Sequence, residues 1–76
     1  MNRPAIIERL RIVLEETTGN RMTFPSSMDI ASFFDDDEYN RFRDLTIAEF
    51  DLDGGALIDT ASTFFELVVL LEGEIS

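Results

Sequence analysis

Apolar residues recur at three- and four-residue intervals near the start of the chain, with charged residues between them. This spacing puts the apolar residues on one side of a helix. The stripe consists of Ile6, Ile7, Leu10, Val13 and Leu14. Pro4 suits the first helical turn, where its missing N–H would have no partner. Gly19-Asn20 tolerates positive φ and ends the helix. The pattern therefore predicts a helix over residues 4 to about 17.

The middle of the chain combines a helix breaker with two further helical patterns. Pro25 disfavours helix at the residue before it, so residues 21–25 are expected to be extended. Ser26 or Ser27 then caps a short helix. The apolar positions of this short helix are Met28, Ile30, Ala31, Phe33 and Phe34. The acidic run 35–38 suits a helix N-terminus, where carboxylates meet the positive end of the helix dipole. A long helix is therefore expected from Asp36 or Asp37 to about Phe50, with Tyr39, Phe42, Leu45 or Thr46, and Ala48 or Glu49 along one side.

The strongest turn signal is the stretch 51–55, Asp-Leu-Asp-Gly-Gly. After it, Asp59 or Thr60 is expected to cap a final helix that runs to about Glu72 and is stopped by Gly73. Its apolar positions are Phe64, Phe65, Leu67, Val68, Leu70 and Leu71. The sequence thus predicts an all-α fold: a single small domain over residues 1–76, built as a four-helix bundle with three longer helices and one short one.

Composition and charge narrow the functions open to such a bundle. Sixteen acidic residues against six basic ones give a net charge of -10, and every basic residue is an arginine. Without cysteine or histidine, the chain can form no Cys/His zinc site, thiolate nucleophile, imidazole base or Ser-His-Asp triad. We therefore expect a protein that is not an enzyme. Direct binding to a nucleic-acid backbone is disfavoured because no cluster of cations exists, and basic protein surfaces are the natural partners.

The ends of the chain bear on its expected location. Charged residues interrupt the first apolar run too early for a secretory signal, and the run 67–71 is far shorter than the ~20 residues that span a bilayer. We expect a cytoplasmic protein that does not contact membranes.

Three segments resemble the acyl carrier protein family: 7–16, similar to its first helix; 36–51, similar to its acidic second helix and closing with Glu49-Phe50; and 58–68, similar to the entry into its last helix. The resemblance spans most of the chain. It implies an acidic four-helix domain that docks on basic patches of larger enzymes, and 4′-phosphopantetheine as the cofactor.

The attachment site implied by this resemblance is an Asp-Ser-Leu motif at the start of the second helix, whose serine carries the phosphopantetheine. Asp35-Asp36-Asp37 stands at that place, and a carboxylate cannot accept the arm as a serine does. Ser27-Met28-Asp29 imitates the motif locally, so Ser27 is the candidate attachment residue. The alternative is that Ser26 and Ser27 serve as helix caps, and a chain without an attachment serine would act through binding alone.

The resemblance and the charge together predict a partner-docking surface. Its candidate residues are Asp35, Asp36, Asp37, Glu38, Asp44 and Glu49. A focused negative field accelerates encounter with a basic surface. The alternative is a charge run that only keeps the surface solvated.

Two other function classes remain open. The stretch from Asp51 resembles an EF-hand calcium loop. Asp51, Asp53 and Asp59 stand at loop positions one, three and nine and are the candidate calcium ligands. Position twelve, where the loop needs a bidentate glutamate, is Ser62. Such a degenerate helix–loop–helix pair would bind calcium weakly or bind a protein; a plain Gly-Gly turn is the alternative. The net charge also permits an acidic mimic of nucleic acid that inhibits a DNA-binding protein.

Overall fold

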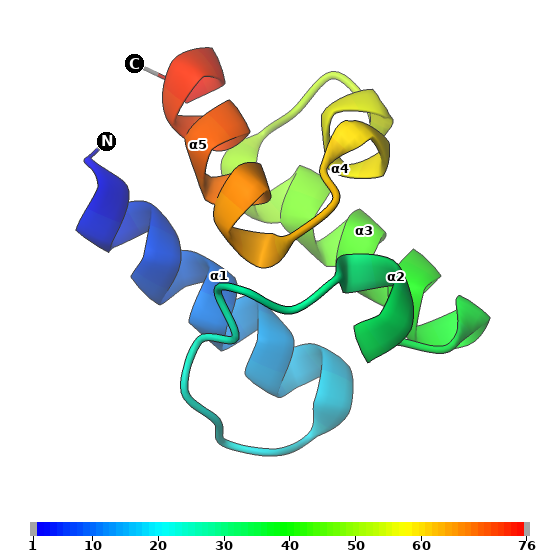
Figure 1. Ribbon diagram of the computed structural model, residues 1–76. Helices are drawn as coiled ribbons and strands as arrows, with labels where there is room; N and C mark the ends of the chain where they lie inside the picture. Colours follow the sequence, from blue (N-terminus) through cyan, green and yellow to red (C-terminus); the bar gives the residue numbers. More distant parts are fainter. Residues whose placement is uncertain (1, 76) are drawn as a thin grey trace.

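The computed structural model describes residues 2–75. Within this range the chain forms five helices and no strand: α1 (Arg3–Thr18), α2 (Ile30–Phe33), α3 (Asp36–Phe50), α4 (Ala56–Thr60) and α5 (Phe64–Ile75) (Figure 1). The prediction of an all-α fold with three long helices is confirmed. The expected count of four helices is wrong, because a second short helix, α4, lies between α3 and α5.

Helices α1 and α3 begin and end within one residue of the predicted bounds, and their capping groups account for this. The Asn2 side chain accepts a hydrogen bond from the Ala5 N–H at 3.1 Å, and Gly19, with φ at 76°, ends α1 in the left-handed conformation. Asp35 and Glu38 form a reciprocal capping box at the start of α3. Local side-chain chemistry therefore fixes both long helices to within a residue or two of the prediction.

The expected serine cap of α2 is wrong. Ser26 and Ser27 lie in a turn, Met28 stays outside the helix, and Asp29 occupies the N-cap position without a side-chain hydrogen bond. The reason is that this segment runs alongside the chain before α5. The Ile30 N–H donates to the Ser62 carbonyl at 3.0 Å, and the Phe65 N–H donates to the Ser26 carbonyl at 2.9 Å. These hydrogen bonds across to the other segment keep the chain out of the helix until Ile30.

Both expected ends of the last helix are wrong as well. Asp59 and Thr60 lie inside α4, and α5 begins at Phe64, after Thr63, whose hydroxyl accepts from the Glu66 N–H at 3.1 Å. The helix also continues through Gly73 to Ile75. A glycine inside a helix costs only about 1 kcal/mol, and the partly buried Ile75 continues the four-residue spacing of the buried Leu67 and Leu71. Packing therefore carries α5 past the expected stop.

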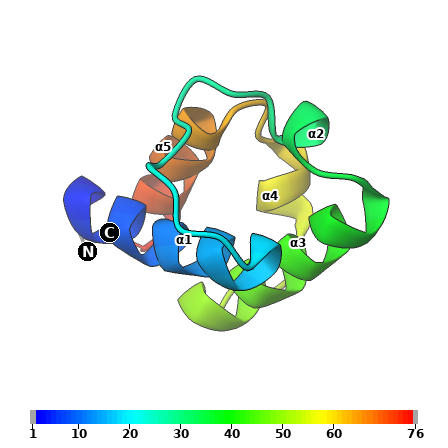
Figure 2. The same ribbon diagram turned by 90° about the horizontal axis from the view of Figure 1, so that it is seen from below.

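The buried apolar residues form a single cluster to which every helix contributes. Its members are Ile6, Leu10, Val13, Leu14, Ile30, Phe34, Phe42, Phe50, Ile58, Phe64, Leu67, Val68 and Leu71. Helix α1 packs against both α3 and α5, and α4 packs against α5. Figure 2 shows α1 and α3 on one side of the molecule, with α2, α4 and α5 on the other. This arrangement leaves one long side of α3 open to solvent.

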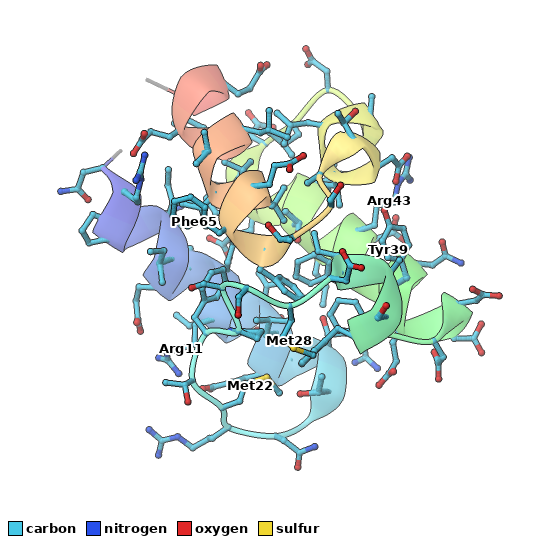
Figure 3. The ribbon with its side chains drawn as sticks, viewed as in Figure 1. Arg11, Met22, Met28, Tyr39, Arg43 and Phe65 are labelled. Carbon is cyan, nitrogen blue, oxygen red and sulfur yellow. The ribbon has the colours of Figure 1, made fainter. Side chains whose placement is uncertain are left out.

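Phe64 is at the centre of the aromatic packing. Its ring meets those of Phe24, Phe33, Phe34 and Phe42 at centroid distances of 5.9, 5.2, 5.9 and 5.8 Å, with steep interplanar angles. Edge-to-face pairs of this kind contribute beyond the area that they bury. The neighbouring Phe65, one of the predicted apolar positions of the last helix, is 45% exposed and lies between α5 and α1 with the Arg3 guanidinium over its ring (Figure 3).

Candidate functional site

Helix α3 carries three exposed carboxylates without an ion-pair partner among residues 2–75: Asp36, Asp37 and Asp44. We call these three residues the α3 acidic face. The buried positions of the helix are Phe42, Thr46 and Phe50. Since residues three or four apart share a side of a helix, positions 37, 41, 44 and 48 lie opposite the core, whereas Asp36, in the first turn, shares the side of Tyr39. The exposed Arg41 is therefore the one basic side chain of α3 opposite the core.

Two other predicted docking residues have a local structural role. The Asp35 carboxylate accepts from the Glu38 N–H at 2.8 Å, and the Glu38 carboxylate accepts from the Asp35 N–H at 3.2 Å. Each carboxylate thus pairs with a backbone donor that the helix itself leaves unsatisfied. Asp35 and Glu38 therefore cap the start of α3, and of the acidic run only Asp36 and Asp37, which lie between them, belong to the acidic face.

Glu49, the sixth predicted docking residue, points away from the acidic face. Its Oε2 lies 3.3 Å from Nη1 of Arg9 on α1, so this carboxylate joins two helices. The predicted docking set therefore divides into three unpaired carboxylates, two capping residues and one ion-paired residue.

The arginines explain this division. Four of the six form ion pairs within the described chain: Arg3 with Glu72, Arg9 with Glu49, Arg11 with Glu8 and Glu15, and Arg43 with Asp59. Because most of the positive charge is already neutralised by specific carboxylates, the surplus negative charge remains on the others. The α3 acidic face carries part of that surplus at two places on one helix, about two turns apart.

Ser27 lies on the connection between α1 and α2, in the turn where the Met28 N–H donates to the Pro25 carbonyl at 3.1 Å. Its side chain is exposed. It belongs to a different element from the acidic face and does not begin a helix. The candidate attachment residue is therefore accessible, in a setting unlike the helix start that the sequence resemblance implied.

Two of the three aspartates proposed as calcium ligands have structural roles, and the third, Asp53, is exposed in the connection between α3 and α4. Asp51 ends α3 with φ at 53°, and α4 occupies the middle of the would-be loop. Asp59 lies on α4, and its carboxylate accepts from Arg43 Nε and Nη2 at 3.0 and 3.1 Å and from the Tyr39 hydroxyl at 2.8 Å. No group of three acidic side chains placed to hold a metal ion occurs within residues 2–75.

The Arg43–Asp59 pair is a structural link that sequence reasoning missed. Figure 3 shows Tyr39 and Arg43 on the side of α3 that faces α4. Hydrogen bonding to Arg43, followed by that to Tyr39, lowers the pKa of Asp59, whereas burial is the main cause that raises the pKa of Tyr39. The Arg43 guanidinium also fills the space beside Gly55, where a Cβ atom would overlap it. These contacts hold the short helix α4 against α3.

A hollow of about 340 Å³ lies where the α3–α4 connection, α4 and the end of α5 meet. Its lining residues are Leu52, Asp53, Gly54, Ala56, Leu57 and Glu74. Nothing in the sequence pattern indicates it, because Glu74 is distant in sequence from the other five residues.

Comparisons with known proteins add no relative: no family model, no curated protein and no solved structure matches this chain. Among residues 2–75, no helix has the length and apolar character needed to cross a bilayer. The arrangement of the acidic face offers non-covalent recognition of cations, because its carboxylates are accessible and unpaired.

Proposed function

We propose that this protein is an acidic, acyl carrier protein-like interaction domain that docks the α3 acidic face on a basic surface of a larger enzyme. The observation that carries the proposal is the set of exposed, unpaired carboxylates of Asp36, Asp37 and Asp44 on one helix, with Asp37 and Asp44 opposite the core. Four of the chain's arginines are engaged elsewhere, so these carboxylates are free to meet arginines or lysines of a partner.

The spacing of the acidic face suits protein docking. Asp36 and Asp44 are separated by about 12 Å along the helix axis at a rise of ~1.5 Å per residue. This separation slightly exceeds the Debye length of about 8 Å at physiological ionic strength, so a partner surface must present several cations to engage both ends. Such a charge array increases the association rate and loses strength as salt is added.

The likeness to carriers rests on the acidic, all-α character of the chain and on the acidic run that opens α3. Where the family has its attachment serine, this chain has aspartates, so the proposed role requires no phosphopantetheine. Ser27 remains the candidate residue if the arm is present after all, since its side chain is exposed.

The cofactor question is decided by intact mass after incubation with a phosphopantetheinyl transferase and coenzyme A. A mass increase of one phosphopantetheine, lost in Ser27→Ala and retained in Ser26→Ala, would establish a carrier loaded at Ser27. An unchanged mass, alongside a conventional carrier that is modified in the same reaction, supports a role in binding alone.

The docking test begins with a photo-crosslinking residue at Ala48, an exposed position on the solvent side of α3, in cells that produce the protein. Binding to the crosslinked partner is then measured for Asp36→Asn/Asp37→Asn/Asp44→Asn. The matched control, Glu16→Gln/Asp29→Asn/Asp51→Asn, removes the same number of exposed charges elsewhere.

We expect the acidic-face variant to bind about tenfold more weakly, or worse, because exposed charge pairs contribute up to about 1 kcal/mol each. The control should retain most of the affinity. Equal losses in the two variants would mean that only net charge matters and would overturn the docking proposal. If the partner binds DNA, and DNA competes with this protein, the nucleic-acid mimic is the correct interpretation.

A further inference from the structure

The hollow at the end of α5 has the composition of a binding site for one amphipathic group. It is bordered by the connection that leaves α3, by α4 and by the last turn of α5, which lie at one end of the molecule (Figure 1). Its volume of about 340 Å³ is at the small end of the range of ligand pockets, roughly 300–1,000 Å³. A single long side chain is therefore an occupant of suitable size.

The lining of the hollow combines apolar and negative surface. Leu52 and Leu57 are half-buried and pack against the core cluster, so they provide apolar walls. The side chains of Asp53 and Glu74 are exposed, and their carboxylates have no hydrogen-bond or ion-pair partner among residues 2–75. No arginine lines the hollow.

We propose that this hollow binds an arginine side chain of a protein partner, with the aliphatic stem on Leu52 and Leu57 and the guanidinium at Asp53 and Glu74. Arginine places its methylene groups along apolar surface while its charged end stays near water. Its five donors can serve two carboxylates at once, and it is less strongly hydrated than the ammonium of lysine.

The two arginines that form ion pairs with α4 and α5 are already engaged there. Arg43, beside Gly55, is bound to Asp59, and Arg3, near the end of α5, is bound to Glu72. The two carboxylates of the hollow therefore have no cation partner within the described chain, and a cation that binds them would come from another molecule. This site is separate from the α3 acidic face, and its occupancy does not depend on the function proposed above.

The test uses two blocked tripeptides, Leu-Arg-Leu and Leu-citrulline-Leu, which have nearly the same shape and differ in charge. Amide NMR spectra of the full chain are recorded as each peptide is added. We expect saturable shifts at residues 52–57 and at Glu74 with the arginine peptide, weakening as salt is added. The citrulline peptide should bind about tenfold more weakly, since its neutral head forms no ion pair with the two exposed carboxylates.

Variants separate a built site from general attraction. Asp53→Asn/Glu74→Gln should weaken binding of the arginine peptide about tenfold. The matched control, Glu16→Gln/Asp29→Asn, removes the same charge far from the hollow and should change affinity less than about twofold, as expected for screened surface charges. Ala56→Leu keeps both carboxylates and fills part of the hollow, so it should also weaken binding. Native-like amide spectra of the free variants show that each is folded.

Three results would overturn the proposal: equal affinity for the two peptides, equal weakening by the two double variants, or shifts confined to α3. The first would indicate an apolar hollow without charge recognition, and the second non-specific attraction to an acidic protein. The third would assign cation binding to the α3 acidic face alone. Since the Asp36→Asn/Asp37→Asn/Asp44→Asn variant keeps the hollow intact, failure of the docking function and failure of this site are distinguishable.

Discussion

Thr46 offers the sharpest test of how this small core is built. It lies on the inner side of α3, one turn from Phe42 and one turn from Phe50, and is fully buried. Its hydroxyl has no hydrogen-bond partner within residues 2–75. A buried hydroxyl that has given up its bond to water without replacing it costs about 1–3 kcal/mol. Thr46 therefore reduces the stability of the fold.

We predict that Thr46→Val stabilises the protein by about 1–2 kcal/mol, because valine has nearly the same shape and removes the unsatisfied hydroxyl. The helix propensities of the two residues are similar. A gain of 1 kcal/mol corresponds to an increase of about 4–8 °C in the Tm of a domain of this size. Urea unfolding followed by circular dichroism gives the free energy directly, with a slope of roughly 1 kcal/mol/M.

Thr17→Val is the matched control. Thr17 is also buried in a helix, at 6% exposure, but its hydroxyl donates to the Val13 carbonyl at 2.8 Å. Removing that bond should cost up to about 1 kcal/mol, so the two substitutions are expected to have opposite signs. A destabilising Thr46→Val would refute the reasoning, because it would mean that the hydroxyl finds a partner in solution, such as the Phe42 carbonyl four residues earlier.

Three further predictions concern the contacts that hold the short helix and the last helix. The pKa of Asp59 is lowered in the fold, so its contribution to stability is complete above its unfolded pKa and is lost as pH falls below about 4. The midpoint of urea unfolding should therefore fall less steeply with acid in Asp59→Asn than in the native protein. Equal slopes in the two proteins would contradict this. Gly55→Ala should raise the Tm by about 2–8 °C in an Arg43→Ala background, where an alanine replaces glycine without strain. In the native background the new Cβ displaces Arg43, so the rise in Tm should be clearly smaller. Thr63→Ala should lower the free energy of unfolding, measured in urea, by about 0.5–2 kcal/mol through loss of the cap on α5. The Ser62 hydroxyl makes no hydrogen bond among the described residues, so Ser62→Ala should change that free energy by no more than about 0.5 kcal/mol. Similar losses in the two variants would argue against the cap.

The parts of the fold that the sequence predicts correctly are those decided by neighbours in the chain. The start of α3 depends on Asp35 and Glu38, three residues apart, and the end of α1 depends on Gly19. The errors occur where distant segments decide. Ser26 resembles a helix cap, but its carbonyl accepts a hydrogen bond from the N–H of Phe65, thirty-nine residues further along the chain. A local capping preference of about 1 kcal/mol is readily overridden by several such backbone hydrogen bonds.

The candidate site shows the same limit in its charges. The sequence identifies the acidic run and Asp44, but it gives no sign that Glu49 pairs with Arg9 or that Asp59 pairs with Arg43, because these partners are 40 and 16 positions apart. Only the folded arrangement separates carboxylates that join helices from those left unpaired.

That separation also determines what the net charge can do. A charge of -10 spread evenly over the surface would attract any cation without selecting one. In this chain, ion pairs neutralise Glu49 and Asp59 on the two flanks of α3, between the helix and its neighbours α1 and α4. Two unpaired carboxylates of the α3 acidic face, Asp37 and Asp44, remain on the solvent side between those flanks, on a helix whose opposite side is fixed in the core, and Asp36 adds a third at the first turn. Because these charges are held at fixed spacing, a partner with cations at the same spacing forms all the contacts together, whereas a partner with another spacing loses them. The proposed selectivity therefore depends on which carboxylates the arginines of this chain already neutralise.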